Sequence, residues 1–571
     1  MFRPVRRPLV AAAAVLGSVF PAAAQAAPPP SELPWLHVAH PAGQRPVIVD
    51  ARGRTVILHG VNVVGVEDDF YTTDSGQEPG PTPIHPIDPA AYAGTCPPMS
   101  HHAGEAPVCE VDAAKPEYAQ SSAASSRNDF AQMRALGFNI VRLGVSWSQL
   151  EPTPGTYSRM YIDRIAQVVG WARRQGVYVL LDMHQDNYSR FTPETAPISV
   201  PPLLTPSQEG SAHADGAPPW AVITDGEPAL APRGISELNL YVNAAQTSFW
   251  LNRVPSAAPQ GASPGPGIQD HYIGAMIALA RRFRNDSTVV GYDIMNEPAP
   301  GAIPLGAFST AVLFPFYAKV IATLTGPAVG ANRQSFWFEP PGVRNITSAP
   351  DQLALPFTTY PNLVYSPHVY THVFSADALL GIPNSPYPLS YDQPYQVADA
   401  EARSMHAALM VGEYGDSAAA DETYLRSETA AQDRAQAGSA IYAWKGGCGA
   451  GANVSDCEKA WTVYAGDPAT PPAQNIGLVT SRLKFLSRAY PRATAGRLDS
   501  YTYDPDRRTF TMTATATRAG QETVVFIPYT ATGNVTAAGH ARVARVDLEP
   551  DGTRLAYAST TGPGEYSVAL G

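Results

Sequence analysis

The sequence predicts an α/β fold, a (β/α)8 TIM barrel followed by a small C-terminal antiparallel β-sandwich. Between about residues 45 and 490, short apolar runs rich in β-branched residues alternate with stretches of helical period. That alternation indicates a parallel sheet with crossover helices, and eight such repeats fit a closed barrel. The eight predicted strands are, in order, Thr55–Asn62, Asn139–Ser146, Val177–His184, Val289–Met295, Gln334–Glu339, Leu363–His368, Ala408–Glu413 and Ala440–Lys445.

Helical stretches between the predicted strands support this count. Apolar residues recur at helical spacing over 162–172 and 272–283, and Gly176 follows the first stretch as a residue suited to end a helix. We expect these apolar faces to pack against the barrel and to carry no chemistry.

Past Tyr490 the pattern changes to short alternating β segments separated by turn residues such as Asp504-Pro505-Asp506. We therefore place the barrel at 27–490 and the β-sandwich at 491–571. The sandwich could bind carbohydrate or brace the barrel. Bracing is the simpler interpretation, because no aromatic platform stands out in this part of the sequence.

Residues 1–26 have the pattern of an export signal. Three arginines precede an apolar run over residues 9–20, and Ala24-x-Ala26 follows as a cleavage pattern. The apolar run is shorter than the roughly 18–20 residues that span a bilayer, which favours a cleaved signal peptide over a membrane anchor. We expect a secreted protein that is cleaved near Ala26 and Ala27.

The four cysteines fit an exported protein. Their spacing favours two local disulfides, Cys96–Cys109 and Cys448–Cys457, although spacing alone does not establish connectivity. A zinc site is the competing interpretation, since two histidines lie between the first pair. The cysteines lack the close pairing of structural zinc sites, so we expect no metal.

Two long insertions, at about 65–125 and 192–267, interrupt the repeat and are rich in Pro, Gly, Ser and Ala. Both leave from the C-terminal ends of strands, where TIM barrels carry their active sites. They could be loosely ordered surface loops. Alternatively, the aromatic residues of the second insertion form a packed wall that contacts a substrate, namely Trp220, Phe249 and Trp250.

The charge of the chain argues against a nucleic-acid partner. Its net charge is −11, its pI is about 5.6, and it has no run rich in lysine or arginine. No nucleotide-binding motif is present either, and we expect no cofactor.

Two segments, Asp293–Pro298 and Met410–Gly415, each place one glutamate at the end of an apolar, strand-like run. On a barrel, Glu297 would follow the fourth strand and Glu413 would end the seventh, so their carboxyl groups would converge over the barrel mouth. Glycoside hydrolysis needs such a pair, one carboxyl to protonate the leaving oxygen and one to attack or stabilise the anomeric carbon. The sequence therefore predicts a paired-carboxylate active site.

This arrangement resembles the clan of retaining glycosidases that includes glycoside hydrolase family 5. The resemblance implies that Glu297 is the acid/base and that Glu413 is the nucleophile. Arg142, on the second predicted strand, is well placed to keep Glu413 ionised through a charge-assisted bond. Its alternative role is a buried salt bridge that only stabilises the barrel.

The resemblance implies further contacts with the sugar. Asn296 would donate to the 2-hydroxyl, and His368 and Tyr370 match a His-x-Tyr pair whose tyrosine hydroxyl approaches the nucleophile. Trp444 matches a tryptophan that stacks beneath the sugar. A lone histidine or tryptophan is more often a packed core residue, so these predictions rest on positions at strand ends.

One segment narrows the family. Asp182–Arg190 resembles the third-strand signature of endoglycoceramidases and related glycosylceramidases, which act on glycosphingolipids, and Gly216–Val222 and Tyr490–Ala493 add to the likeness. The resemblance implies that Asp182 and His184 bind hydroxyls of the glycone. It further implies a glycolipid or oligosaccharide substrate, with transient contact with a membrane or micelle surface. We expect a monomer.

The sequence leaves two alternatives open. A β-glucanase or β-glucosidase of the same family would act on a polysaccharide or a small glycoside. Such an enzyme would not need the apolar aglycone wall that a lipid leaving group requires, for which Trp220, Phe249 and Trp250 are the candidates. A noncatalytic carbohydrate-binding protein is less favoured, because binding alone does not require two glutamates together with Asn296 and Arg142.

Overall fold

The computed structural model of this chain describes residues 32–63, 127–185, 188–189, 204–206, 216–226, 230–232, 243–255, 265–350, 355–375, 388–447, 461–467 and 474–571. The predicted signal peptide, the first predicted insertion and both predicted cysteine pairs lie outside these residues. The second predicted insertion is described only in part.

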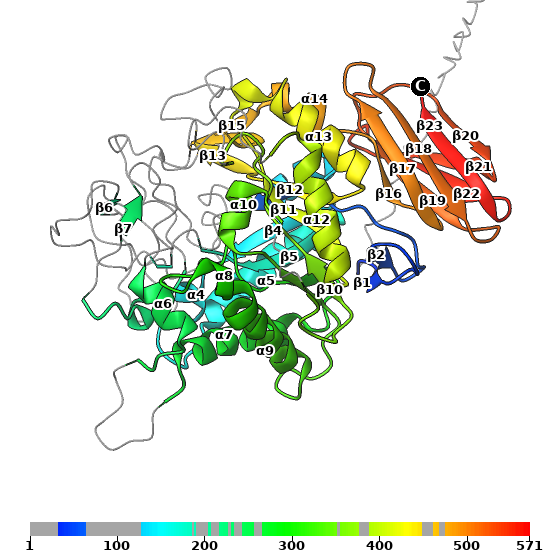
Figure 1. Cartoon of the computed structure of the whole chain (residues 1–571). Coiled ribbons are helices and arrows are strands. Elements are labelled where there is room, and N and C mark those ends of the chain that lie inside the picture. Colours follow the sequence, from blue (N-terminus) through cyan, green and yellow to red (C-terminus); the bar gives the residue numbers. More distant parts are fainter. Residues whose placement is uncertain are drawn as a thin grey trace, which may run out of the picture.

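Eight parallel strands close into a barrel in chain order, which confirms the predicted fold class (Figure 1). Each strand is short and buried along its whole described length, as expected for a parallel sheet covered by helices. Every predicted strand overlaps one of the observed strands, which are β3 (His59–Val63), β4 (Ile140–Val145), β5 (Tyr178–Met183), β8 (Val289–Asp293), β9 (Ser335–Phe338), β10 (Leu363–Tyr365), β11 (Ala408–Tyr414) and β12 (Gly438–Ile441).

Helices surround the barrel and bury their apolar stripes against it. The two predicted apolar stripes lie on α5 and α7, the two longest of the described helices. Gly176 ends α5 with a left-handed backbone (φ 70°), which glycine adopts at little cost. The helices are α3 (Arg127–Leu136), α4 (Trp147–Leu150), α5 (Arg159–Gln175), α6 (Ala244–Trp250), α7 (Ile268–Phe283), α8 (Leu305–Phe308), α9 (Phe314–Thr325), α10 (Gly342–Thr347), α12 (Asp392–Ser404), α13 (Tyr424–Ala435) and α14 (Thr480–Leu486).

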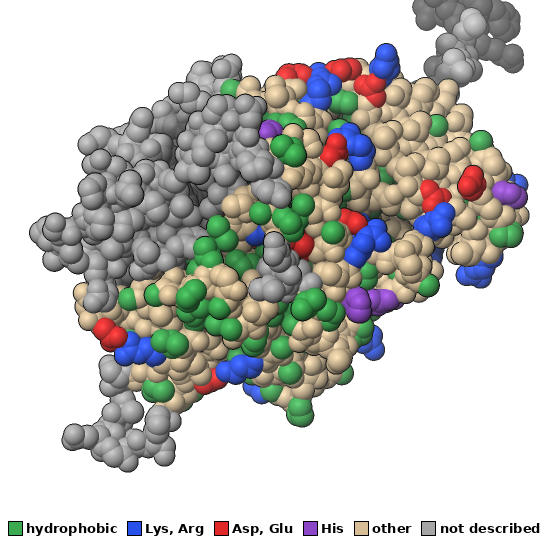
Figure 2. All heavy atoms as spheres, in the orientation of Figure 1, with side chains coloured by type: hydrophobic (Ala, Val, Ile, Leu, Met, Phe, Trp, Pro, Cys, Tyr) green, Lys and Arg blue, Asp and Glu red, His purple; other side chains and the backbone are tan. Residues whose placement is uncertain are grey.

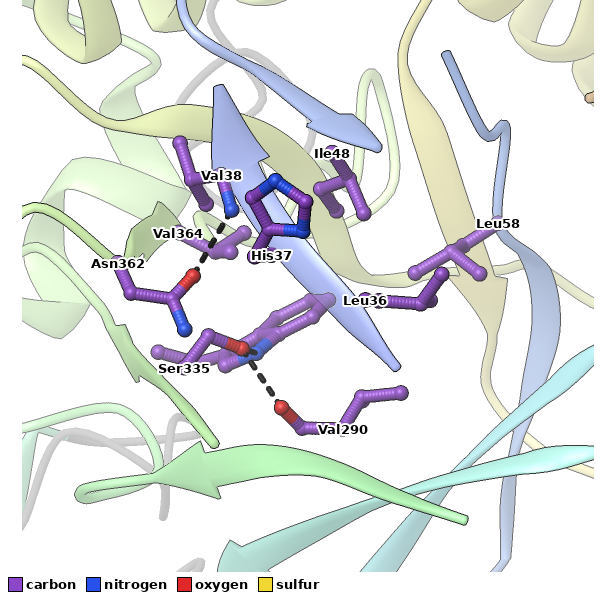
Figure 3. A pocket seen from close by; sticks show the side chains of 10 residues that line it. Leu36, His37, Val38, Ile48, Leu58, Val290, Ser335, Asn362 and Val364 are labelled. Carbon is purple, nitrogen blue, oxygen red and sulfur yellow. Dashed lines mark hydrogen bonds between the residues drawn. The ribbon is translucent and has the colours of Figure 1, made fainter. Parts of the chain in front are cut away.

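A hairpin closes the N-terminal end of the barrel. Its strands β1 (Leu36–Ala39) and β2 (Val47–Asp50) pair antiparallel. Figure 3 shows Leu36 and Ile48 of this hairpin facing Val290 and Val364 of the barrel strands across a small apolar pocket. This end of the barrel is therefore plugged by packed side chains, and substrate chemistry is left to the opposite end.

Among the described helices, one continuous run, Leu305–Thr325, is long and apolar enough to cross a membrane by length and composition alone. A core helix of a soluble protein passes the same test. Here Phe316 packs edge-on against Phe249, and Tyr317 packs against Phe338 of β9. These contacts place the helix against the barrel as part of its core.

The C-terminal residues form two four-stranded antiparallel sheets, in the orders β16-β19-β22-β21 and β17-β18-β23-β20. Alternate residues of β18 and β23 are buried, so the predicted period of two matches the structure in these strands. The strands are β16 (Tyr490–Ala493), β17 (Arg497–Asp504), β18 (Thr509–Ala516), β19 (Glu522–Ile527), β20 (Val535–Gly539), β21 (Ala541–Leu548), β22 (Arg554–Thr560) and β23 (Gly564–Leu570).

Two smaller sheets complete the described part of the chain. One has three strands, β13 (Lys445–Gly447), β14 (Tyr464–Asp467) and β15 (Gln474–Leu478), and it lies beyond the end of β12. The other has two, β6 (Leu204–Pro206) and β7 (Leu230–Pro232).

Buried polar contacts tie the sandwich to the barrel. Arg488 donates to Asp433 of α13 (2.6 Å) and contacts the ring of His59 at the start of β3. The Tyr490 ring stacks on His59, with ring centres 4.7 Å apart, and its hydroxyl donates to the Gly137 carbonyl (2.8 Å). Burial and the neighbouring Arg488 charge both lower the pKa of His59, so this ring is neutral at neutral pH. These contacts fit the bracing role predicted for the sandwich.

Glu428 gives the fold a specific pH dependence. It is fully buried on α13 and accepts a hydrogen bond from Tyr395, and burial raises its pKa from 4.5 to about 8. Between these two values the folded state binds one proton more than the unfolded state, so the free energy of unfolding falls as pH rises. Glu428→Gln removes the titration. Between about pH 6 and 8, we expect the free energy of unfolding of wild type to fall by about 1 kcal/mol or more relative to that of this variant. Urea denaturation at each pH measures this difference.

The control is Glu565→Gln, because Glu565 is exposed on β23. Its unfolding free energy should follow that of wild type across the same pH range. Parallel pH curves for Glu428→Gln and wild type would show that Glu428 does not hold a proton in the folded protein.

Candidate active site

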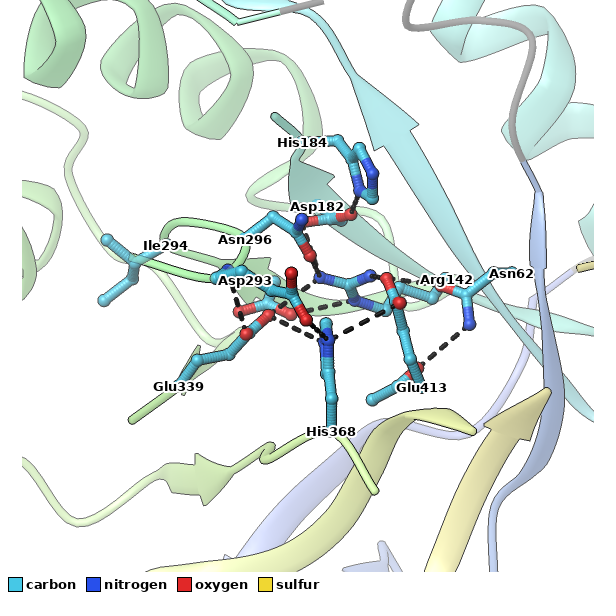
Figure 4. A network of polar contacts seen from close by, with 12 residues as sticks. Asn62, Arg142, Asp182, His184, Asp293, Ile294, Asn296, Glu339, His368 and Glu413 are labelled. Carbon is cyan, nitrogen blue, oxygen red and sulfur yellow. Dashed lines mark hydrogen bonds and ion pairs between the residues drawn. The ribbon is translucent and has the colours of Figure 1, made fainter. Parts of the chain in front are cut away.

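The candidate site lies at the C-terminal ends of the barrel strands and is built around Arg142 of β4. The Arg142 side chain has no exposed surface, and polar residues from neighbouring strands surround its guanidinium (Figure 4). Its partners are Glu413 Oε1 (2.6 Å), Asn62 Oδ1 (3.1 Å), Asn296 Oδ1 (2.9 Å), Glu339 Oε1 (2.9 Å), Asp182 Oδ1 (2.9 Å) and Asp293 Oδ2 (3.0 Å).

Four carboxylates thus share one buried cation. Burial alone would lower the pKa of Arg142, but the carboxylates of Asp182, Asp293, Glu413 and Glu339 outweigh burial and hold that pKa well above its ordinary value. Burial raises the pKa of Asp293 well above its usual range, although Arg142 opposes the shift. The site therefore combines a permanent cation with a buried carboxyl group, that of Asp293, whose burial disfavours its charged form.

Glu413 lies within β11, and the fold holds both of its carboxylate oxygens. Arg142 binds one oxygen, and the Tyr370 hydroxyl donates to the other (2.7 Å). Burial and the Glu413 charge raise the pKa of Tyr370 well above its ordinary value, so the phenol stays a donor. Two donors hold this carboxylate in one orientation, as a nucleophile requires.

Glu297 has a different environment. It lies four residues beyond the end of β8, its side chain is 34% exposed, and its backbone is in the left-handed region (φ 41°). Its oxygen Oε1 accepts from Asn345 Nδ2 (3.2 Å) and lies 2.7 Å from His368 Nδ1. Arg142 does not bind it. This carboxyl is therefore partly open to solvent, unlike that of Glu413.

The two glutamates are close enough to act on one bond. One oxygen of Glu297, one of Glu413 and a ring nitrogen of His368 lie within 4.8 Å of one another. Retaining glycosidases hold their two carboxyl groups about 5–5.5 Å apart, whereas inverting enzymes separate them by roughly 6.5–9.5 Å to admit a water. The observed spacing matches retention.

The same three groups have the geometry of a cation site. Burial lowers the pKa of His368, but the charges of Glu339 and Glu413 outweigh burial and raise it well above its ordinary value. A protonated imidazole has no free lone pair for a metal. The electrostatics therefore favour a proton at this position over a metal ion.

The predicted glycone-binding residues lie beside this centre. Asp182 ends β5 next to Arg142, and its Oδ2 lies 2.6 Å from His184 Nδ1. Asn296 accepts from Arg142 and donates one amide hydrogen to the Gln185 carbonyl (2.8 Å), which fixes the orientation of its amide group. All three side chains are buried at the floor of the site. Their contacts with a sugar remain predictions.

Trp444 is placed differently from the expectation. It lies three residues beyond β12, has no exposed surface, and its ring packs against Tyr464 with ring centres 5.7 Å apart. No face of the ring is open for stacking in this structure. Its predicted position beneath the sugar therefore remains a prediction.

The predicted aglycone wall is wrong for two of its three residues. Phe249 has no exposed surface and Trp250 has 6%, because both rings pack against Phe316 of α9. Trp220 is half-buried, and its indole donates to the Glu151 carbonyl (3.1 Å). Apolar contact with helices around the barrel draws these rings into the core.

A pair of aromatic rings with partly exposed surface lies instead beside Tyr370, the residue that donates to Glu413. The ring of Phe374 stacks on Trp461 (5.4 Å, 19° between planes) and packs against Tyr370 (5.2 Å), and 41% of Phe374 is exposed. Figure 2 also shows hydrophobic side chains gathered over α6 and α8. In these parts of the chain Leu251 is 65% exposed and Leu305 is 50% exposed.

Sequence reasoning missed four polar residues of the site, namely Asn62, Asp293, Glu339 and Asn345. Glu339 had a usable signal, because it is a carboxylate at the C-terminal end of a predicted barrel strand, and Asp293 lies two residues before the end of another. Asn62 also ends a predicted strand. Asn345 follows no such pattern, since it lies on α10 and reaches Glu297 only through the tertiary fold.

Known proteins are similar to this chain in sequence and in fold. Endoglycoceramidase I of Rhodococcus hoagii is 26% identical over 403 residues, which cover 68% of this chain and 70% of that protein. A glucosylceramidase of Rhizopus delemar is 27% identical over 271 residues, 45% of this chain and 35% of that protein. The crystal structure of an endogalactoceramidase matches with a TM-score of 0.66 and 27% identity, covering 94% of this chain and 100% of that one.

Two family models also match, one described as cellulase (glycosyl hydrolase family 5) over residues 102–446 and one as the glycoside hydrolase family 5 C-terminal domain over residues 488–569. The first alone spans more than half of the chain. This protein, with its paired glutamates and its relatives among endoglycoceramidases and glucosylceramidases, therefore belongs to glycoside hydrolase family 5.

Proposed function

We propose that this protein is a retaining β-glycosidase that cleaves the bond between a glycan and a lipid aglycone, in the manner of an endoglycoceramidase. The observation that carries this proposal is that one buried arginine contacts only one of the two glutamates. Arg142 binds Glu413 but not Glu297, whose side chain is partly exposed. Such a pair supports a nucleophile and an acid/base within reach of one glycosidic bond.

The reaction follows from these two environments. Glu297 gives its proton to the glycosidic oxygen while Glu413 attacks the anomeric carbon, so the lipid alcohol leaves and a glycosyl-enzyme ester forms. Glu297, now a carboxylate, then takes a proton from water, and the water oxygen attacks the anomeric carbon. The ester breaks, Glu413 returns to its carboxylate form, and the sugar is released with its β configuration retained.

The substrate class rests on the relatives and on the surface beside the nucleophile. Two of the proteins described above carry names that refer to ceramide glycosides, and each is 26–27% identical over about two thirds or more of this chain. A lipid leaving group needs apolar surface next to the bond that breaks. Phe374 and Trp461, stacked beside Tyr370, supply such a surface in place of the wall first predicted.

The export of this protein is part of the same proposal. An extracellular glycosidase would meet glycolipids on membranes or micelles, and the N-terminal pattern of residues 1–26 supports secretion with cleavage near Ala27. Disulfides Cys96–Cys109 and Cys448–Cys457 fit that compartment. We further propose that the enzyme acts as a monomer in brief contact with the lipid surface.

Azide separates the roles of the two glutamates. On an activated aryl β-glycoside, Glu413→Ala with azide should yield the α-glycosyl azide, because azide attacks directly in place of the missing nucleophile. Glu297→Ala should yield the β-glycosyl azide, because azide attacks the glycosyl-enzyme that Glu413 still forms. Without azide, each variant should lose about 100-fold or more in kcat. Product configuration is read by proton NMR.

Glu428→Gln is the control for this experiment, because it changes a buried glutamate outside the site. It should hydrolyse the substrate with retention and accumulate neither azide product. The same azide anomer from both active-site variants would contradict the assignment of roles.

A substrate panel tests the lipid aglycone. Purified enzyme with glycosphingolipids, cellooligosaccharides and aryl glycosides should release intact oligosaccharide and ceramide from the first group, identified by mass spectrometry. Phe374→Ala should lower kcat/KM on the glycosphingolipid about 10-fold, since it removes apolar surface next to the leaving group, and change it less than about 2-fold on the aryl glycoside. Cleavage of short glucans alone would instead identify a β-glucanase or β-glucosidase.

Leu548→Ala is the matched control, because Leu548 is an exposed apolar residue (74%) on β21 of the C-terminal sandwich. It should leave both activities unchanged. An equal loss on both substrates in Phe374→Ala would assign Phe374 to the support of Tyr370 instead of the lipid.

Export is checked by expression of the full chain in a secreting host. N-terminal sequencing of the protein from the medium should begin near Ala27. Its mass should fall by about 4 Da relative to the fully reduced form if both disulfides are present. Protein that keeps residues 1–26 and stays with the cells would contradict secretion.

A further inference from the structure

Glu339 is a buried carboxylate that the reaction described above does not use. It lies directly beyond β9 (Ser335–Phe338), has no exposed surface, and its backbone carbonyl accepts from the Tyr317 hydroxyl (3.0 Å). It cannot touch a sugar in the cleft from this position. Its carboxylate nevertheless reaches the acid/base by two separate routes.

The first route is the backbone of Glu297. Glu339 Oε2 accepts from the Glu297 backbone N–H (3.0 Å). Glu297 has a φ of 41°, in the left-handed region that residues with a side chain seldom adopt. Such a backbone persists only where its surroundings hold it. Glu339 supplies one of these restraints, and the direction of the Glu297 side chain depends on it.

The second route is the ring of His368. Glu339 Oε1 lies 3.1 Å from His368 Nε2, and the other ring nitrogen, Nδ1, lies 2.7 Å from Glu297 Oε1. Glu339 Oε1 also accepts from Arg142 Nη2 (2.9 Å). A carboxylate oxygen tolerates the nearby ring nitrogen only if that nitrogen carries a hydrogen. Nε2 therefore carries a hydrogen in every state of the ring, and the proton between Nδ1 and Glu297 Oε1 is the one that the pair can give up.

We propose that Glu339 is a positioning residue for the acid/base, which fixes the backbone of Glu297 and the tautomer of His368 and so retains the proton that Glu297 gives to the leaving group. Glu297 and His368 share this proton across the contact between Oε1 and Nδ1. The carboxylate of Glu339 keeps the proton in this pair to higher pH, since its negative charge disfavours proton loss. The proposal rests on the acid/base role of Glu297 and not on the lipid aglycone.

The electrostatics of the site agree with this arrangement. Burial lowers the pKa of His368, while Glu339 is the strongest of the charges that raise it well above its ordinary value. Burial raises the pKa of Glu339 itself, and His368 and Arg142 oppose that shift. The other charged or titratable groups around the pair each have contacts of their own, and these groups are Glu413, Arg142, Asp293, Asp182 and Tyr370.

Glu339→Gln tests the proposal through its loss of kcat/KM on substrates with different leaving groups. A phenyl glycoside needs its leaving oxygen protonated, whereas a dinitrophenyl glycoside does not. The variant should lose about 10- to 100-fold in kcat/KM on the phenyl glycoside and less than about 3-fold on the dinitrophenyl glycoside. The alkaline limb of the kcat/KM profile should move to lower pH by about one unit, because a neutral amide no longer retains the proton.

Two further variants separate this role from a structural one. Glu339→Asp keeps the charge but not the reach, so kcat should fall while the alkaline limb stays within about 0.3 pH units of wild type. Asp433→Asn neutralises another buried carboxylate, which pairs with Arg488 beside the C-terminal domain, and it should leave the limb and the leaving-group pattern unchanged. Equal losses on both glycosides, or an unmoved limb in Glu339→Gln, would overturn the proposal.

Wild-type protein decides the question even if Glu339→Gln does not fold. Nitrogen-15 NMR of labelled histidine, with the His368 signal assigned by its loss in His368→Asn, should show a hydrogen on Nε2 both below and above the alkaline limb. A neutral ring with its hydrogen on Nδ1 would overturn the proposal. If Glu297 were not the acid/base, Glu297→Ala would lose similar kcat/KM on the phenyl and the dinitrophenyl glycoside. That result would contradict the proposed function itself, independently of the role of Glu339.

Discussion

The active site depends on one interaction, the burial of Arg142 among four carboxylates. A guanidinium with no exposed surface loses all of its hydration, and only close, well-oriented partners can offset that cost. Here those partners come from β5, β8, β9 and β11 and the loops that follow them. The relative heights of the strands around the barrel mouth are therefore tied to one side chain. Removal of the arginine would leave several buried negative charges without a counterion, a far larger cost than loss of a surface pair.

The same arginine gives the two glutamates different surroundings. Glu413 receives Arg142 on one oxygen and the Tyr370 hydroxyl on the other, so its charge is stabilised before any substrate arrives. Glu297 lies outside the reach of the guanidinium and contacts His368 instead, a group that can hold or release a proton. The two carboxyl groups thus differ, as retention requires, because the cation contacts only one of them.

The eight strands and both catalytic candidates could be predicted because buried parallel strands are continuous apolar runs, and a carboxylate at the end of such a run has few structural uses. The support of Glu297 could not be predicted in the same way. Asn345 reaches it from a helix that follows another strand, and sequence does not give that geometry. Phe249 and Trp250 show the opposite error, since aromatic residues in a Pro-rich insertion look the same whether they line a cleft or pack against α9.

Tyr370 marks the boundary between the charged and the apolar parts of the site. Its hydroxyl donates to Glu413, while its ring packs against Phe374, which in turn stacks on Trp461. A leaving group seated on that aromatic pair would keep water from the side of the nucleophile on which Tyr370 lies. Hydrogen bonds to a charged group strengthen when water is excluded, so an apolar aglycone would reinforce the contact that holds Glu413 in place. Recognition of a lipid and orientation of the nucleophile would then depend on the same tyrosine, which a soluble sugar polymer would not engage in this way.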